Sequence, residues 1–191
     1  LVGSEMCIRD RNQAEQKVKW RSSGLAAPVS AVRYEGLIAV AEHGKSRVIS
    51  LNKDGEVEAI LAEDLPAPTG LTVREGHLFV SDRSLGKILR IAENGQRITE
   101  PEIVAENLVS PEGFDFFDRK LVVIEADLGE VSMINASGDK SLLAKIPPGT
   151  QAASDLQPPS QVFNGVAVDD NGNVYVPGET NRALYKISNP F

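Results

Sequence analysis

Acidic side chains recur where short apolar segments of this sequence end. Glu42, Asp82 and Glu125 each close such a segment, and Asp127 and Glu179 lie just beyond the ends of two segments. A carboxylate beside a bound cation can act as the base that activates water for lactone or ester hydrolysis. A short acid at such a point can instead accept backbone N–H groups of the next turn, which is a purely structural role. The residue pattern is compatible with either role.

Other kinds of chemistry find little support in the sequence. It contains neither a Gly-x-Ser-x-Gly nucleophile elbow nor a Gly-x-x-x-x-Gly-Lys phosphate loop. Of its two histidines, only His43 lies beside one of the strand-end acids, and it has no partner motif. Zinc would require clustered His or Cys, whereas carboxylate and amide oxygens suit a hard cation such as Ca²⁺.

An internal repeat predicts the elements that carry these acids. Four segments align, and they begin at Pro28, Pro68, Pro111 and Phe163, at spacings of 40, 43 and 52 residues. Each contains apolar stretches of strand length bounded by Gly, Asp and Asn turns, and helical periodicity is absent. The spacings suit propeller blades of about 40 to 50 residues. The sequence therefore predicts an all-β fold, a β-propeller of four-stranded antiparallel blades with about four blades present.

The start of the chain differs from the rest. Residues 17–27 resemble the outer-strand segment 56–65, so we expect the chain to open on an outer strand before the first blade. Residues 1–11 match the repeats in no respect, hold the only cysteine, and resemble a translated sequencing adapter at the edge of a metagenomic reading frame. We expect the partial propeller to occupy residues 12–191.

Charge and hydropathy restrict the partners. The formal net charge is -7, which disfavours nucleic acid and anionic lipid because both require clustered Lys and Arg. No apolar run approaches the ~18 residues of a membrane span. We expect a monomer that binds neither nucleic acid nor membrane, and the sequence leaves its localisation open.

The repeat resembles NHL-type repeats and the six-bladed propeller family of senescence marker protein, gluconolactonase and luciferin-regenerating enzyme. The likeness lies in blades that open with Pro-x-Gly, as at 68–70 and 111–113, or with Asn-Gly, as at 164–165, and that continue into an apolar strand ending near an acid. It implies that the chain is an N-terminally truncated fragment, with about four blades of six; the alternative is a self-contained four-bladed ring, although rings that small are uncommon. In a propeller the first strand of each blade begins, and the second ends, at one rim of the central channel, so residues at those points converge.

The resemblance also implies a metal site, because this family places one oxygen-bearing residue per blade after the opening residue. Glu112 and Asn164 match that position, whereas Val29 and Thr69 supply little or nothing. With a divalent cation, Ca²⁺ being the expected ion, and with Glu125 as base in the same blade as Glu112, the full-length protein would hydrolyse lactones or related esters. Glu112 and Asn164 could also do no more than shape their turns. We do not expect the fragment alone to be active.

The alternative is a non-catalytic NHL-type propeller that binds a protein or a glycan through its rim loops. Val29 and Thr69 favour this alternative, because a catalytic site tolerates few missing ligands. The proline-bearing segment 146–161 is expected at the same rim, where such loops carry specificity. Under either hypothesis the residues expected to meet the ligand at the rim are Thr69, Glu42, His43, Asp82, Asp127 and Glu179.

Overall fold

The computed structural model describes residues 21–146, 165–178 and 183–191. Residues 1–11, Asn164, Glu179 and nearly all of the proline-bearing segment lie outside these ranges. The described residues form β-strands and one short 3-10 helix, η2 (His43–Lys45). Among them, no helix has the length and apolar character needed to cross a membrane.

The strands form antiparallel sheets that follow one another along the chain. The first sheet contains β1 (Pro28–Tyr34), β2 (Leu37–Glu42), β3 (Arg47–Leu51) and β4 (Val57–Ala62). The second contains β5 (Pro68–Arg74), β6 (His77–Asp82), β7 (Lys87–Glu93) and β8 (Gln96–Ala105). The third contains β9 (Pro111–Phe117), β10 (Lys120–Glu125), β11 (Glu130–Ile134) and β12 (Lys140–Lys145). The fourth, within the described ranges, contains β13 (Ala167–Val168), β14 (Val174–Gly178) and β15 (Ala183–Ile187).

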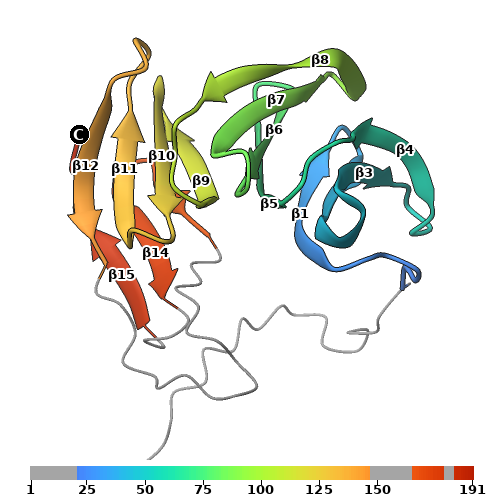
Figure 1. Cartoon of the computed structure of the whole chain (residues 1–191), viewed down its shortest axis with the longest axis horizontal. Coiled ribbons are helices and arrows are strands. Elements are labelled where there is room, and N and C mark those ends of the chain that lie inside the picture. Colours follow the sequence, from blue (N-terminus) through green and yellow to red (C-terminus); the bar gives the residue numbers. More distant parts are fainter. Residues whose placement is uncertain (1–20, 147–164, 179–182) are drawn as a thin grey trace, which may run out of the picture.

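These sheets are the blades of a β-propeller. Figure 1 shows them side by side in an arc, with β1, β5 and β9 on its inner side. The first strands contact one another in series, β1 with β5, β5 with β9, and β9 with β13. The all-β propeller prediction is confirmed, and the first three blades begin at Pro28, Pro68 and Pro111 as the repeats indicated.

Each boundary between blades encloses its own buried apolar cluster, and alternate residues of one strand serve different clusters. In β6, Leu78 and Val80 pack toward the first blade, whereas Phe79 packs toward the third. In β10, Val123 faces the second blade and Ile124 faces the fourth. Because side chains alternate between the two faces of a strand, a blade that is apolar on both faces needs a neighbour on each side.

The repeated glycine after Pro-x has a packing reason. A Cβ atom at Gly70 would lie 2.5 Å from the carbonyl oxygen of Glu112, and one at Gly113 would lie 2.4 Å from the backbone of Gly165. Ser81 links the same strands, since its Oγ accepts the Gly70 N–H at 2.8 Å and donates to the Glu112 carbonyl at 2.5 Å. The starts of the second, third and fourth blades thus approach one another within a distance that only glycine permits at Gly70 and Gly113.

The outer strand expected over residues 17–27 is not formed over 21–27, the described part. Gly24 and Ala27 have positive φ angles of 79° and 45°, which interrupt an extended strand. The backbone instead binds the first blade, because the N–H of Gly44 donates to the Ala26 carbonyl and that of His43 to the Ala27 carbonyl, both at 3.1 Å.

Replacing Gly113 with alanine should destabilise the propeller, because the added methyl group overlaps the backbone of Gly165. We expect the free energy of unfolding to fall by about 1–3 kcal/mol, the usual cost of overpacking. Urea unfolding followed by circular dichroism measures this change. Gly165→Ala is the matched control, since a Cβ there meets no described atom within 4 Å. Equal effects of the two substitutions would contradict the close-approach explanation.

Candidate rim site and its acidic anchors

A charged cluster links the second and third blades at the rim where the first strands begin. Arg83 directly follows β6, Glu112 lies at the start of β9, and Asp127 follows β10. The Arg83 guanidinium donates to Glu112 Oε1 at 2.7 Å and to Asp127 Oδ1 at 2.6 Å. The second oxygen of Asp127 accepts the Ser110 hydroxyl at 2.5 Å. One arginine therefore holds two acids of the neighbouring blade.

Burial divides this rim cluster, which consists of Arg83, Glu112 and Asp127, into two parts. The Glu112 side chain is 8% exposed, whereas those of Arg83 and Asp127 are 35% and 54% exposed. A buried carboxylate next to a guanidinium fixes the planar arginine fork in place. Glu112 thus orients Arg83, and Arg83 and Asp127 present a donor and an acceptor to solvent.

The three strand-end acids share a structural role. Glu42, Asp82 and Glu125 are completely buried. In each case a carboxylate oxygen accepts the N–H of a residue one or two positions before the blade's first strand (Ala26 at 2.8 Å, Ala67 at 3.0 Å and Val109 at 2.9 Å, respectively). Each acid therefore anchors the entry of its own blade to the end of the second strand, as a short acid beside a turn commonly does.

Glu125, the predicted base, has further partners inside the third blade. Its Oε1 accepts the Ser132 hydroxyl at 2.8 Å, and both of its oxygens lie 3.1 Å from the Lys140 ammonium. These partners belong to β11 and β12, the outer half of the blade. A base must reach the proton that it removes, directly or through one water. The catalytic role of Glu125 stays a prediction, and the contacts described here are structural.

Glu42 is held by charges as well as by the backbone. Its Oε2 accepts Arg47 Nε at 2.5 Å, and Lys45 Nζ lies 3.7 Å from Oε1. Burial alone would raise the pKa of Glu42. The Ala26 N–H, the Arg47 hydrogen bond and the two positive charges outweigh burial, so the pKa lies below its ordinary value.

The remaining rim residues lie in varied surroundings. Thr69 Oγ1 donates to the Pro111 carbonyl at 3.1 Å and lies 3.0 Å from Ser81 Oγ, so it joins two blades. His43 is exposed in η2 of the first blade. The rim thus brings Glu112 and Asp127 together around Arg83, while Glu42, Asp82 and Glu125 each turn into their own blade.

The described residues do not form a cation shell. Among them, no group of three or more His, Cys, Asp or Glu side chains could hold a metal ion. Calcium requires six to eight oxygens, and Glu112 supplies one carboxylate that is already paired with Arg83. Asn164, the other predicted ligand, lies outside the described residues. The described part of the rim does not fit Ca²⁺, and the metal stays a prediction.

Sequence reasoning missed Arg83, although the repeat contained a signal for it. In the aligned repeats the position after the strand-end acid holds His43, Arg83 and Ala126. This position carries a basic or imidazole side chain in two of the three repeats, whereas the acid before it is anchored inside the blade. The next residue of the third repeat is Asp127, which pairs with Arg83.

Comparison with known proteins agrees with the propeller fold. A family described as "Beta-propeller repeat" matches residues 162–186. No curated protein sequence matches the chain. The similarity to solved structures therefore covers more of the chain than the family match does.

Three solved structures illustrate that likeness. A gluconolactonase from Xanthomonas campestris is 16% identical, with a TM-score of 0.63, over 85% of this chain and 62% of that one. Virginiamycin B lyase from Staphylococcus aureus is 15% identical, with a TM-score of 0.54, over 85% of this chain and 56% of that one. A chain of a nidogen–laminin complex is 15% identical, with a TM-score of 0.58, over 86% of this chain and 65% of that one. The chain thus spans less than two thirds of each, and at these identities the likeness defines the fold alone.

Glu42→Gln should reduce stability at neutral pH by about 1–3 kcal/mol, because charge-assisted hydrogen bonds are lost. The folded pKa lies below the ordinary value of 4.5, so this stabilisation is complete above 4.5 and is lost as pH falls through the folded pKa. The unfolding free energies of variant and wild type should therefore differ at neutral pH and converge as pH falls through the folded pKa, which urea unfolding at a series of pH values measures. Glu58→Gln, at an exposed position of β4, is the control. A stability difference between Glu42→Gln and wild type that does not change with pH would contradict the role assigned to the ionised Glu42 carboxylate.

Proposed function

We propose that the protein is a non-catalytic binding propeller that recognises its ligand at the rim carrying Arg83 and Asp127. The proposal rests on the burial and the hydrogen bonding of the strand-end acids. Glu42, Asp82 and Glu125 are fully buried and accept backbone hydrogen bonds, so their carboxylates already have structural partners. A rim whose acids anchor turns supports recognition better than hydrolysis.

The rim cluster has the chemistry of a recognition site. Arg83 offers a planar donor whose orientation Glu112 fixes, and Asp127 offers an acceptor beside it. Such a donor and acceptor suit a protein segment or a glycan, both of which present hydrogen-bonding groups of both kinds. The nidogen–laminin structure supports this proposal by analogy, since its matching chain belongs to a protein complex.

A second candidate function is the metal-dependent hydrolysis of sugar lactones. Glu112 favours it, because this carboxylate lies at the start of the first strand of its blade, the position that the family resemblance assigns to a metal ligand. The similarity in fold to a gluconolactonase also favours it by analogy. In this candidate Glu112 and Asn164 would bind the cation, and the cation would polarise the lactone carbonyl and activate water.

The binding proposal predicts that Arg83→Ala removes ligand capture. A printed library of glycans and peptides, probed with wild type and variant in parallel, should contain ligands whose signal falls by roughly tenfold or more in the variant, as expected for loss of a charged hydrogen bond. Arg97→Ala is the control, because Arg97 forms an exposed ion pair with Glu63 away from the rim cluster. Ligands bound equally by wild type and Arg83→Ala would contradict recognition at this rim.

Enzyme assays separate the two candidates. We expect hydrolysis of glucono-lactone to proceed at the rate of the buffer alone, with or without added Ca²⁺, and calorimetric titration with Ca²⁺ to give no binding heat. Calcium-dependent hydrolysis that disappears in Glu112→Gln would establish the lactonase and overturn the binding proposal. Hydrolysis unaffected by Glu112→Gln would point to a site other than this rim.

A further inference from the structure

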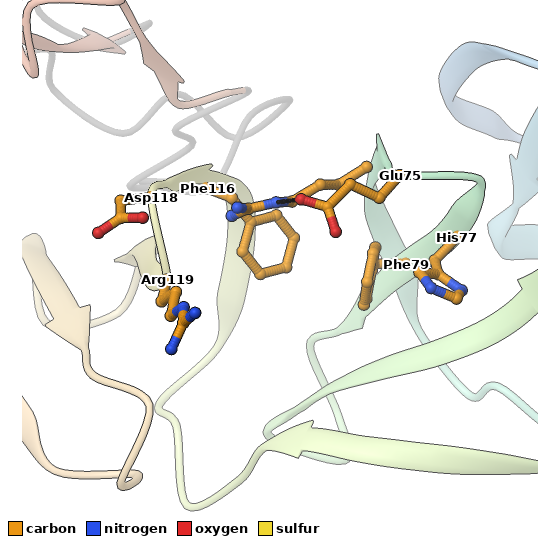
Figure 2. Close-up of a pocket in the computed structure, with 7 residues that line it drawn as sticks. Glu75, His77, Phe79, Phe116, Asp118 and Arg119 are labelled. Carbon is orange, nitrogen blue, oxygen red and sulfur yellow. Dashed lines mark hydrogen bonds and ion pairs between the residues drawn. The ribbon is translucent and has the colours of Figure 1, made fainter.

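A pocket lies between the second and third blades at the ends of the strands opposite the rim cluster. Its volume is about 460 Å³, within the range of roughly 300–1,000 Å³ usual for small-molecule sites. The turn between β5 and β6 and the turn between β9 and β10 form its edges. Figure 2 shows the rings of Phe79 and Phe116 next to each other, with Asp118 and Arg119 to one side and His77 to the other.

Aromatic rings form one wall of this pocket. The Phe79 and Phe116 ring centroids are 4.9 Å apart, and Phe114 contacts Phe116 in an edge arrangement with centroids 6.2 Å apart. Phe79 and Phe114 are buried, so the wall is part of the core between the two blades. The guanidinium carbon of Arg74 lies 5.3 Å from the Phe116 centroid, which keeps the arginine at the aromatic wall. The pocket therefore has a rigid, apolar side.

Polar side chains also line the pocket, and several of them have donor or acceptor atoms that no described residue uses. Arg74 uses its Nε for Glu75, at 3.2 Å, and its terminal nitrogens have no partner among the described residues. Asp118 and Arg119 are exposed and likewise form no hydrogen bond or ion pair within the described part of the chain. These groups can therefore bind a ligand without giving up contacts to the described residues.

His77 contributes a hydrogen-bond donor, and its contact with Arg90 determines which ring nitrogen carries the proton. Arg90 lies 3.0 Å from His77 Nδ1, and because arginine can only donate, Nδ1 must be the acceptor. The proton of the neutral imidazole is then on Nε2, which leaves that N–H for another acceptor. Arg90 is itself held by Glu102, at 2.5 Å, so the arrangement is firm.

Charge balance narrows the ligand class. The pocket is lined by two arginines and two carboxylates, Arg74, Arg119, Glu75 and Asp118, so its formal charges cancel. A charged ligand would be attracted by the two arginines and repelled by the two carboxylates, or the reverse. An uncharged molecule with many hydroxyl groups can bind to both the arginines and the carboxylates, because each hydroxyl donates and accepts hydrogen bonds. Its C–H face can pack on the phenylalanine wall.

We propose that this pocket is a second binding site, one for an uncharged sugar ring at the end of a glycan. The Asp118 and Glu75 carboxylates accept sugar hydroxyls, and Arg74, Arg119 and His77 Nε2 donate to sugar oxygens. The site goes beyond the proposed function, because it shares no residue with the rim cluster and lies at the other end of the same strands. Either site can fail its test without affecting the other.

Amide chemical shifts of the ¹⁵N-labelled full chain test the proposal. The probes are the methyl glycosides of glucose, galactose and mannose, the disaccharides maltose and cellobiose, and glucuronate as the anionic probe. We expect at least one neutral sugar to shift the amides of Gly76, Asp118 and Arg119 saturably. Arg119→Ala and Asp118→Asn should each weaken that binding by roughly tenfold.

The variants are chosen to preserve the fold. Arg119 is exposed, and asparagine tolerates the left-handed backbone of Asp118, whose φ is 52°. Arg97→Ala serves as the control and should bind like wild type. Stronger binding of glucuronate than of every neutral sugar would overturn the ligand class. Absence of any shift at the pocket, or shifts that persist unchanged in both variants, would overturn the site.

Discussion

The starts of the second, third and fourth blades lie so close together that a methyl group would not fit between them, and several hydrogen bonds between the second and third blades are made across this approach. Gly70 faces the backbone of the third blade, and Gly113 faces that of the fourth. At this distance a single serine, Ser81, can bridge two backbones. The same approach lets the short side chain of Thr69 reach the Pro111 carbonyl. It also brings Arg83 of one blade to Glu112 and Asp127 of the next.

The fold could be predicted from the sequence because its determinants are local and repeated. Alternating apolar residues, turn residues and the Pro-x-Gly starts recur within each repeat, and the strands begin where those starts indicated. The stretch 21–27 was less predictable. Its likeness to an outer strand is compositional, whereas its conformation follows from Gly24 and Ala27 and from hydrogen bonds to residues 43 and 44.

The sites were harder to predict because they depend on contacts between residues far apart in the sequence. The repeat correctly indicated that acids end the second strands, but it did not reveal which way their carboxylates turn. Arg83 meets Asp127 across 44 positions, and no local pattern encodes that contact. The sugar pocket combines a turn of the second blade with a turn of the third, and Phe116 in sequence resembles any other core residue of a strand.

The sharing of each blade between two apolar clusters has a consequence for the growing polypeptide on the ribosome. When the first blade has emerged, the side of it formed by Tyr34 and Leu61 has no cover until Leu78 and Ile91 of the second blade follow. Each later blade covers the apolar face of the blade before it and exposes a new apolar face of its own. At each stage of synthesis the newest blade therefore has an apolar face that its successor has yet to cover, and a pause in translation between blades would leave that face open to chaperones or to aggregation.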